Sequence, residues 1–202
     1  MSEYSLTLIA IDFLRIDSLS TQEKIIHSAV ALFIEHGVAA TTTRAIATHA
    51  CVSEGSIYRY YPSKEEMAWQ IFRDYHHHLA EQLSQSINKC RTTELKINAL
   101  VHCFFNLADE DWLMFRYYLT SQHTHMSKID SKMLTPYQVI SDVVEQGLKL
   151  GEINKGDTNM IAAMAMGAVH QVAINKNFGR IQGALLPHKD YIAERISRLV
   201  CS

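Results

Sequence analysis

The sequence predicts an all-α protein, and three features of its 202 residues support this. Proline occurs three times and glycine eight times, so the residues that interrupt helices are scarce. Apolar residues recur every three or four positions, which is the spacing of one helix face. Helix-capping side chains precede such runs, as in Ser20 with Glu23 and Ser63 with Glu66, which have the spacing of a capping box. No stretch shows the alternation typical of β-strands.

The expected helices form a small N-terminal group and a larger C-terminal group. After an arm at residues 1–19, the first helix covers 21–36 and ends at Gly37. Two short helices follow, one from Thr42 and one from Ser53 to about Tyr61, and a long helix runs from residue 63 to about 90. Further helices are expected at 93–107, 109–122, 132–150, 157–176 and 188–201, with a break at Asp109. We therefore expect about nine helices, in a head at 20–66 and a body at 67–202.

Composition limits the class of protein without naming a function. Hydrophobic residues make up 48 % of the chain and charged residues 20 %, which is typical of a folded globular protein. The formal net charge is −2, so nucleic-acid binding would need a local basic surface. The four cysteines form no CxxC pair and indicate reduced thiols. The absence of a long apolar run and of a signal-peptide pattern leads us to expect a cytoplasmic protein with no membrane partner.

The segment from Thr42 to Tyr61 has the plan of a helix-turn-helix. Two short helices joined by a tight turn and braced by a third can present one helix to the DNA major groove. The periodicity predicts a small core and a polar outer surface. The expected core residues are Ile46, Ala47, Ala50, Val52, Ile57 and Tyr61, and the expected outward residues are Thr42, Thr43, Arg44, Ser53, Glu54, Ser56, Tyr58, Arg59 and Tyr60.

This stretch resembles the N-terminal domain of the tetracycline-repressor (TetR) family. The matching positions cover about 45 residues without a gap. They are Ala31-Leu32-Phe33, Gly37, Thr42, Ile46-Ala47, Ala50-Cys51-Val52-Ser53, Gly55, Tyr58-Arg59-Tyr60-Tyr61 and Ser63-Lys64-Glu65-Glu66. One position departs from the pattern, because Cys51 replaces the usual turn glycine. A residue other than glycine in a left-handed conformation costs roughly 1 kcal/mol, so some strain is expected in this turn.

The resemblance implies a DNA-binding surface whose partner is a double-stranded operator. Its expected contacts are Thr42, Thr43, Arg44, Ser53, Glu54, Gly55, Ser56, Tyr58, Arg59, Tyr60 and Lys64. Lys64 resembles the phosphate-contacting lysine of the family. A cation in the first turn of a helix opposes the helix dipole, and a phosphate would give a reason for it.

For several of these positions a simpler interpretation stays open. Thr42 and Ser53 would serve only as helix caps, and Glu54 would only complement the helix dipole. Tyr58 would belong to the core, and Arg59 would be a solvated surface charge.

The larger C-terminal part is interpreted from the resemblance as a ligand-binding and dimerisation domain. The apolar helix at 157–176, with Tyr191, Ile192, Ile196, Leu199 and Val200, suits a homodimer interface, although burial within one subunit is the alternative. A hydrophobic small-molecule effector is expected in an aromatic core, and core packing alone would also explain most of these residues. The expected ligand-binding residues are His102, Phe105, Trp112, Phe115, Arg116 and Tyr118.

The resulting hypothesis is a one-component transcriptional regulator, a repressor by family default, that binds a pseudo-palindromic operator as a dimer and is released by its ligand. No enzymatic activity, metal or cofactor is expected. The eleven histidines leave a metal-responsive regulator or helical metalloprotein as an alternative, although no His-Glu-x-x-His motif occurs. A sequence-blind architectural DNA protein is a further alternative, disfavoured by the net charge of only +1 over residues 21–64.

Overall fold

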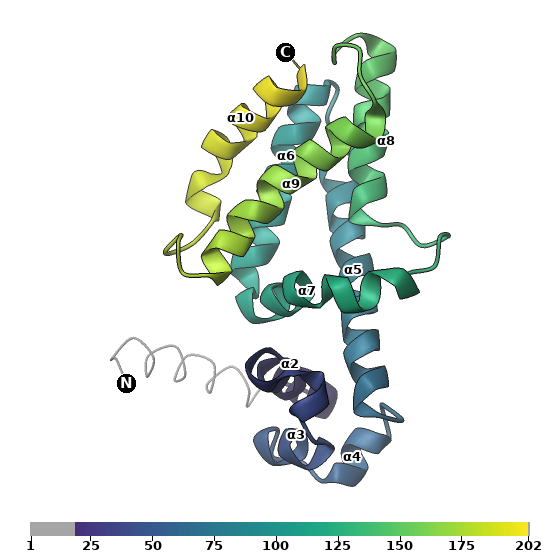
Figure 1. The fold of residues 1–202 in the computed structure, drawn as a ribbon, viewed down its shortest axis with the longest axis vertical. Helices are drawn as coiled ribbons and strands as arrows, with labels where there is room; N and C mark the ends of the chain where they lie inside the picture. Colours follow the sequence, from purple (N-terminus) through teal and green to yellow (C-terminus); the bar gives the residue numbers. More distant parts are fainter. Residues whose placement is uncertain (1–18, 202) are drawn as a thin grey trace. The chain divides into compact units, whose positions relative to one another are not determined.

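The computed structural model describes residues 19–201, and within this range the chain is helical without β-strands (Figure 1). The expectation of an all-α fold is confirmed. The α-helices are α2 (Thr21–Ala40), α3 (Thr43–His49), α4 (Glu54–Tyr58), α5 (Lys64–Ser86), α6 (Thr93–Glu110), α7 (Trp112–His125), α8 (Pro136–Leu150), α9 (Thr158–Asn177) and α10 (Lys189–Cys201). Two short 3-10 helices, η1 (Met126–Lys128) and η2 (Leu186–His188), complete the set. Almost all of the expected arm, residues 1–18, lies outside the described residues.

The chain divides into two compact units between Ile71 and Phe72, within α5. The N-terminal unit holds α2, α3, α4 and the first turns of α5, around a core that includes Ile25, Phe33, Ile46 and Ile57. The C-terminal unit holds the rest of α5 and α6–α10. No helix of the described residues is long and apolar enough to cross a membrane.

Side-chain caps set the helix starts of the N-terminal unit. Ser20 and Glu23 form a complete capping box, as expected. The hydroxyl oxygens of Thr42, Ser53 and Ser63 accept hydrogen bonds from the backbone N–H groups three residues later, at 3.1, 3.2 and 3.1 Å. Each bond satisfies an N–H group that would otherwise lack a partner in the helix. The predicted starts of α3, α4 and α5 are therefore confirmed.

Gly37, where the sequence analysis ends the first helix, is a kink within α2. Its φ of 79° is not helical, and α2 continues beyond it to Ala40. The buried Thr41 then closes this corner, because its hydroxyl donates to the carbonyl of Gly37 at 2.8 Å.

In the C-terminal unit, α6 packs against α10 and α8 packs against α9. The predicted break at Asp109 is wrong: α6 continues to Glu110, and Asp111 ends α6 and caps α7 by accepting from the N–H of Met114. The Asp109 carboxylate instead accepts from the N–H groups of Leu185 and Leu186, at 3.0 and 2.7 Å. This contact spans more than seventy residues, so the local pattern could not reveal it.

Cys51 has a φ of 55°, which makes it the one described residue other than glycine with a positive φ. We expect Cys51→Gly to raise the free energy of unfolding by about 1 kcal/mol, because glycine adopts this conformation without a clash. Urea unfolding of both proteins measures the difference. Cys51→Ala keeps the Cβ and should leave stability near that of the wild type. An equal gain in both variants would show that the thiol, not the backbone, is the source of strain.

Candidate nucleic-acid interface and ligand cavity

The helix-turn-helix separates buried from exposed residues much as the sequence predicts. Ile46, Ala47, Ala50, Ile57 and Tyr61 are buried, whereas Val52 is only partly buried. Tyr58 is 54 % exposed and Tyr60 40 % exposed, so the interpretation of Tyr58 as a core residue is wrong. The other outward residues are exposed or partly exposed; they are Thr42, Thr43, Arg44, Ser53, Glu54, Gly55, Ser56 and Arg59.

Hydrogen bonds within this surface fix the positions of its polar groups. The hydroxyls of Thr43 and Tyr58 lie 3.2 Å apart and connect α3 to the end of α4. The Ser53 and Ser56 hydroxyls lie 2.9 Å apart, and Ser53 also caps α4. Capping by Thr42 and Ser53 is thus observed. It uses one lone pair of each hydroxyl oxygen, so each hydroxyl can still form a further hydrogen bond, which Ser53 shares with Ser56. Capping and DNA contact are compatible at both residues.

Arg44 and Arg59 supply the accessible positive charge of this surface. Both are exposed, and within residues 19–201 neither forms an ion pair. A guanidinium without an intramolecular partner is available to a phosphate or to a guanine edge, which it binds through two parallel hydrogen bonds. The charge is local, as the low net charge of the chain requires.

Lys64 is engaged within the protein. Its Nζ donates to the carbonyl oxygens of Ala39 and Thr41, at 2.8 and 2.7 Å, and lies 3.8 Å from a Glu65 carboxylate oxygen. These carbonyls belong to the C-terminal end of α2, where a cation is favoured by the helix dipole. The structure thus gives a reason for Lys64 that does not involve phosphate. Its contact with DNA stays a prediction.

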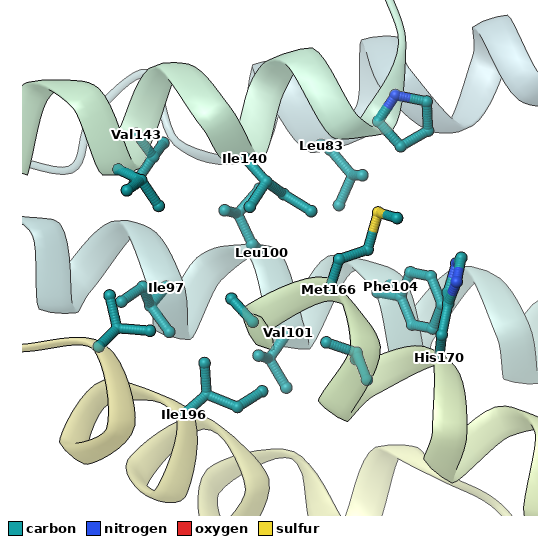
Figure 2. Close-up of a pocket in the computed structure, with 15 residues that line it drawn as sticks. Leu83, Ile97, Leu100, Val101, Phe104, Ile140, Val143, Met166, His170 and Ile196 are labelled. Atoms are coloured by element: carbon teal, nitrogen blue, oxygen red, sulfur yellow. The ribbon is translucent and has the colours of Figure 1, made fainter. Parts of the chain in front are cut away.

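A second candidate site is a cavity of about 40 Å³ within the C-terminal unit (Figure 2). Side chains of α5, α6, α8, α9 and α10 line it, and almost all of them are apolar. They are Leu83, Ile97, Leu100, Val101, Phe104, Pro136, Ile140, Val143, Val144, Ala165, Met166, Val169, His170, Ile196 and Val200. A lining of this kind favours apolar ligands over water, because water needs polar partners.

None of the six residues predicted to bind a ligand lines this cavity. Phe105, Phe115 and Tyr118 are buried in aromatic packing, with Phe115 against Phe104 in an edge-to-face contact with a centroid distance of 4.9 Å. Trp112 lies under the Lys176 ammonium, whose Nζ is 4.8 Å from the ring centroid. The core-packing interpretation therefore describes their place in this structure, and their ligand roles remain untested.

The two polar members of the predicted set are also placed elsewhere. His102 Nε2 lies 2.9 Å from the Asp190 carboxylate and links α6 to α10 near the surface. Arg116 has a buried Nε without a hydrogen-bond partner among the described residues. The sequence analysis missed the aliphatic residues of the cavity, since they look like ordinary core positions. It also missed His170, a histidine on the apolar helix α9.

Two further histidines of the C-terminal unit, His76 and His125, are buried among aromatic rings. His76 is 2 % exposed, its Nδ1 lies 3.2 Å from the Tyr118 hydroxyl, and burial lowers its pKa to about 4. Phe72 stacks on the His76 ring and makes a tilted contact with His125, with centroid distances of 5.7 and 5.2 Å. Over residues 19–201, no three His, Cys, Asp or Glu side chains are grouped as a metal ion would require.

Helices α9 and α10 each have one buried and one exposed apolar face, and they lie next to each other (Figure 1). Ile196 and Val200 are buried and line the cavity, so their assignment to a subunit interface is wrong. The exposed face includes Met160, Met164, Tyr191 and Leu199, and the smaller residues Ala163 and Gly167 of α9 are exposed as well. Burial within one subunit is therefore observed for one side of these helices, and a homodimer interface stays a prediction for the exposed side.

The N-terminal unit has the arrangement of a helix-turn-helix: its short helices are capped, α3 packs on α2 and α4 on α3, and exposed polar side chains edge them. Residues 25–71 match the family model of the bacterial regulatory proteins of the tetR family. The N-terminal unit is thus similar to the DNA-binding domain of this family.

Known relatives extend the likeness beyond the DNA-binding unit. The fatty acid metabolism regulator protein of Bacillus subtilis is 23 % identical over 73 % of this chain and 79 % of its own length. The transcriptional regulator QacR of Staphylococcus aureus is 26 % identical over 76 % of this chain and 85 % of its own. The crystal structure of FadR from Bacillus subtilis with stearoyl-CoA has a TM-score of 0.69 and 19 % identity, covering 87 % of this chain and 97 % of that one. The shared fold includes the C-terminal unit.

We expect Lys64→Met to lower the free energy of unfolding by about 2 kcal/mol, because two carbonyl groups lose a charged donor. Lys89→Met removes an exposed lysine between α5 and α6 and is the matched control. Thermal unfolding of the two variants measures the difference. DNA binding over a salt series separates the roles: loss of a phosphate contact makes the slope of log K against log salt shallower by about 0.9. Wild-type stability together with a shallower slope would contradict the structural role.

Proposed function

We propose that this protein is a one-component transcriptional regulator that binds a pseudo-palindromic operator as a homodimer and is released by a hydrophobic small molecule. The exposed polar surface of α3 and α4, fixed by hydrogen bonds and built on a buried core, is the observation that carries the proposal. A major groove admits one α-helix and displays a distinct pattern of donors and acceptors for each base pair. In this proposal the protein is a repressor: its binding to the operator blocks transcription. It acts in the cytoplasm.

In this proposal the residues of the DNA-binding surface divide into two roles. Ser53, Glu54 and Ser56 lie at the start of α4, the recognition helix, and face base edges, with Gly55 leaving room for close approach. Tyr58, at the end of α4, also faces base edges. Arg44, Thr42 and Thr43 at the start of α3 hold phosphates, and Arg59 and Tyr60 extend the surface beyond α4. Phosphate contacts fix the register on the duplex, whereas base contacts supply sequence preference.

A second copy of the chain completes the DNA reader. One recognition helix of five residues covers only a few base pairs, so two copies related by a two-fold axis are needed to read two half-sites. Regulators of the TetR family bind DNA as dimers. The exposed apolar face of α9 and α10 is the surface that we assign to the subunit contact, because large exposed apolar patches mark interaction sites.

The apolar cavity is the proposed effector site. Its volume of about 40 Å³ is far below the ~300 Å³ of a typical ligand pocket, so an effector has to displace the lining as it enters. The relatives named for fatty acid metabolism, one of them with bound stearoyl-CoA, support an effector with a hydrocarbon chain. A ligand that binds the expanded state better than the compact state shifts the protein toward it, and DNA affinity changes if the two states differ there.

We expect Arg59→Ala to weaken binding to the selected operator by about tenfold and to reduce discrimination against random DNA, because a guanidinium at a base edge supplies 1–3 kcal/mol of selectivity. Selection of bound sequences from a random duplex pool identifies the operator, and fluorescence anisotropy measures both affinities. Arg91→Ala, an exposed arginine outside the DNA-binding unit, should behave like the wild type. Failure of the wild-type protein to enrich any sequence would reject the proposed function.

We expect Ala163→Glu to convert the dimer into a monomer and to weaken operator binding at least tenfold, because it places a charge in the centre of the apolar face. Ala184→Glu makes the same change at an exposed position in the loop between α9 and α10 and is the matched control. Sedimentation velocity reports the mass of each variant. If the Ala163→Glu variant is still a dimer, the subunit interface lies on another surface.

A further inference from the structure

His170 is the polar exception in the lining of the cavity. It belongs to α9 and lies next to Phe104, with a distance of 5.5 Å between the ring centroids. Figure 2 shows the two rings at one end of the cavity, with Val143 and Ile97 toward the other end. The cavity therefore has a polar end and a hydrocarbon end.

No charged side chain balances the ring. Among the fifteen lining residues that the structure describes there is no Lys, Arg, Asp or Glu, and the other side chains have no nitrogen or oxygen atoms. Burial keeps the pKa of His170 below its ordinary value, so the imidazole is neutral near pH 7. A neutral imidazole has one N–H donor and one acceptor nitrogen. A ring nitrogen of His170 that faces the cavity could thus form a hydrogen bond, whereas no side chain of the lining could neutralise a charge.

We propose that His170 is the specificity-determining residue of the cavity, and that it selects an effector with a hydrocarbon chain and an uncharged oxygen-containing group, such as a ketone, ester or thioester carbonyl. The N–H of the ring donates to the carbonyl oxygen, while the chain lies among the aliphatic side chains toward Val143. An ionised carboxylate at the same depth would lose its hydration and meet no cation, which makes its burial costly. A plain hydrocarbon would leave the imidazole unpartnered.

The surroundings of His170 allow such a ligand to enter. Met166 lies beside it in the cavity, and an unbranched thioether side chain adapts to new shapes more easily than a branched one. Widening can therefore begin at the polar end without breaking a hydrogen bond, because none is formed by the His170 ring to another described residue. This inference rests on the proposed function, since it names the effector class of the same cavity.

The test compares three probes of equal length: 2-undecanone, undecane and undecanoate. Each displaces N-phenyl-1-naphthylamine, a neutral fluorescent dye whose own affinity is measured for every variant at pH 7.5. For the wild type we expect the ketone to bind about fivefold more tightly than the alkane, the factor that one neutral hydrogen bond typically supplies. Undecanoate should bind at least tenfold more weakly than the ketone.

The variants assign this preference to the ring. His170→Leu should reduce the ketone-to-alkane ratio to about one while alkane affinity is kept, and His170→Gln should restore part of the ratio through its amide N–H. His188→Leu, an exposed histidine of η2, is the matched control and should keep the wild-type ratio. Thermal unfolding of each variant confirms that it is folded.

Two results would overturn the inference and leave the proposed function intact. One is a ketone-to-alkane affinity ratio that is unchanged in folded His170→Leu. The other is binding of undecanoate as tight as that of the ketone. In either case, release of the operator by the bound probe would show that the proposed function still holds. Failure of all three probes to bind would reject the cavity as the effector site and this inference with it. Sequence-selective DNA binding would then still be tested separately, by the selection of bound sequences from the random duplex pool.

Discussion

The DNA-binding surface depends on helices that are too short to be stable alone. Helix α3 has seven residues and α4 has five, whereas isolated helices shorter than about twelve residues are marginal in water. Two kinds of interaction stabilise α3 and α4 in place of the stability that such short helices lack by themselves. Hydroxyl caps at Thr42 and Ser53 each satisfy a backbone N–H group of the first turn. The buried side chains of Ile46 and Ile57 belong to the core in which α3 packs on α2 and α4 packs on α3. The orientation of the polar surface is thus set by a core of only a few residues.

The same constraint explains the contacts at the junction of α2, α3 and α5. The chain leaves α2 through Gly37, and the unpaired carbonyls at this end are taken up by the Thr41 hydroxyl and the Lys64 ammonium. Lys64 thereby fastens the start of α5 to the corner that precedes α3. A residue that resembles a DNA contact in the sequence is thus also part of the scaffold that orders the other contacts.

The N-terminal unit could be predicted well because its signals are local. Ser20 with Glu23 forms the expected capping box, Gly37 interrupts the first helix, and Cys51 has the positive φ that its place in the turn implied. The C-terminal unit was predicted less well because its functional features depend on contacts between distant residues. His102 meets Asp190, 88 positions away, and Asp109 binds the backbone of Leu185 and Leu186 instead of ending a helix. The cavity draws aliphatic residues from five helices, and nothing in the sequence distinguishes a residue beside a void from one in a filled core. The sequence analysis assigned ligand binding mainly to aromatic residues, yet these pack tightly in the core and line little of the cavity.

Helices α9 and α10 carry the cavity on one face and the exposed apolar surface on the other. Val169 and Ile196 line the void, while Met164 and Leu199 lie on the outside of the same two helices, a single side-chain layer away. Interiors this densely packed transmit displacement instead of absorbing it. In the proposed dimer, occupancy of the void and association of the subunits are then thermodynamically linked. A ligand that pushes these helices outward weakens the dimer, so it binds the separated monomers more tightly than the dimer. Its apparent affinity therefore falls as protein concentration rises.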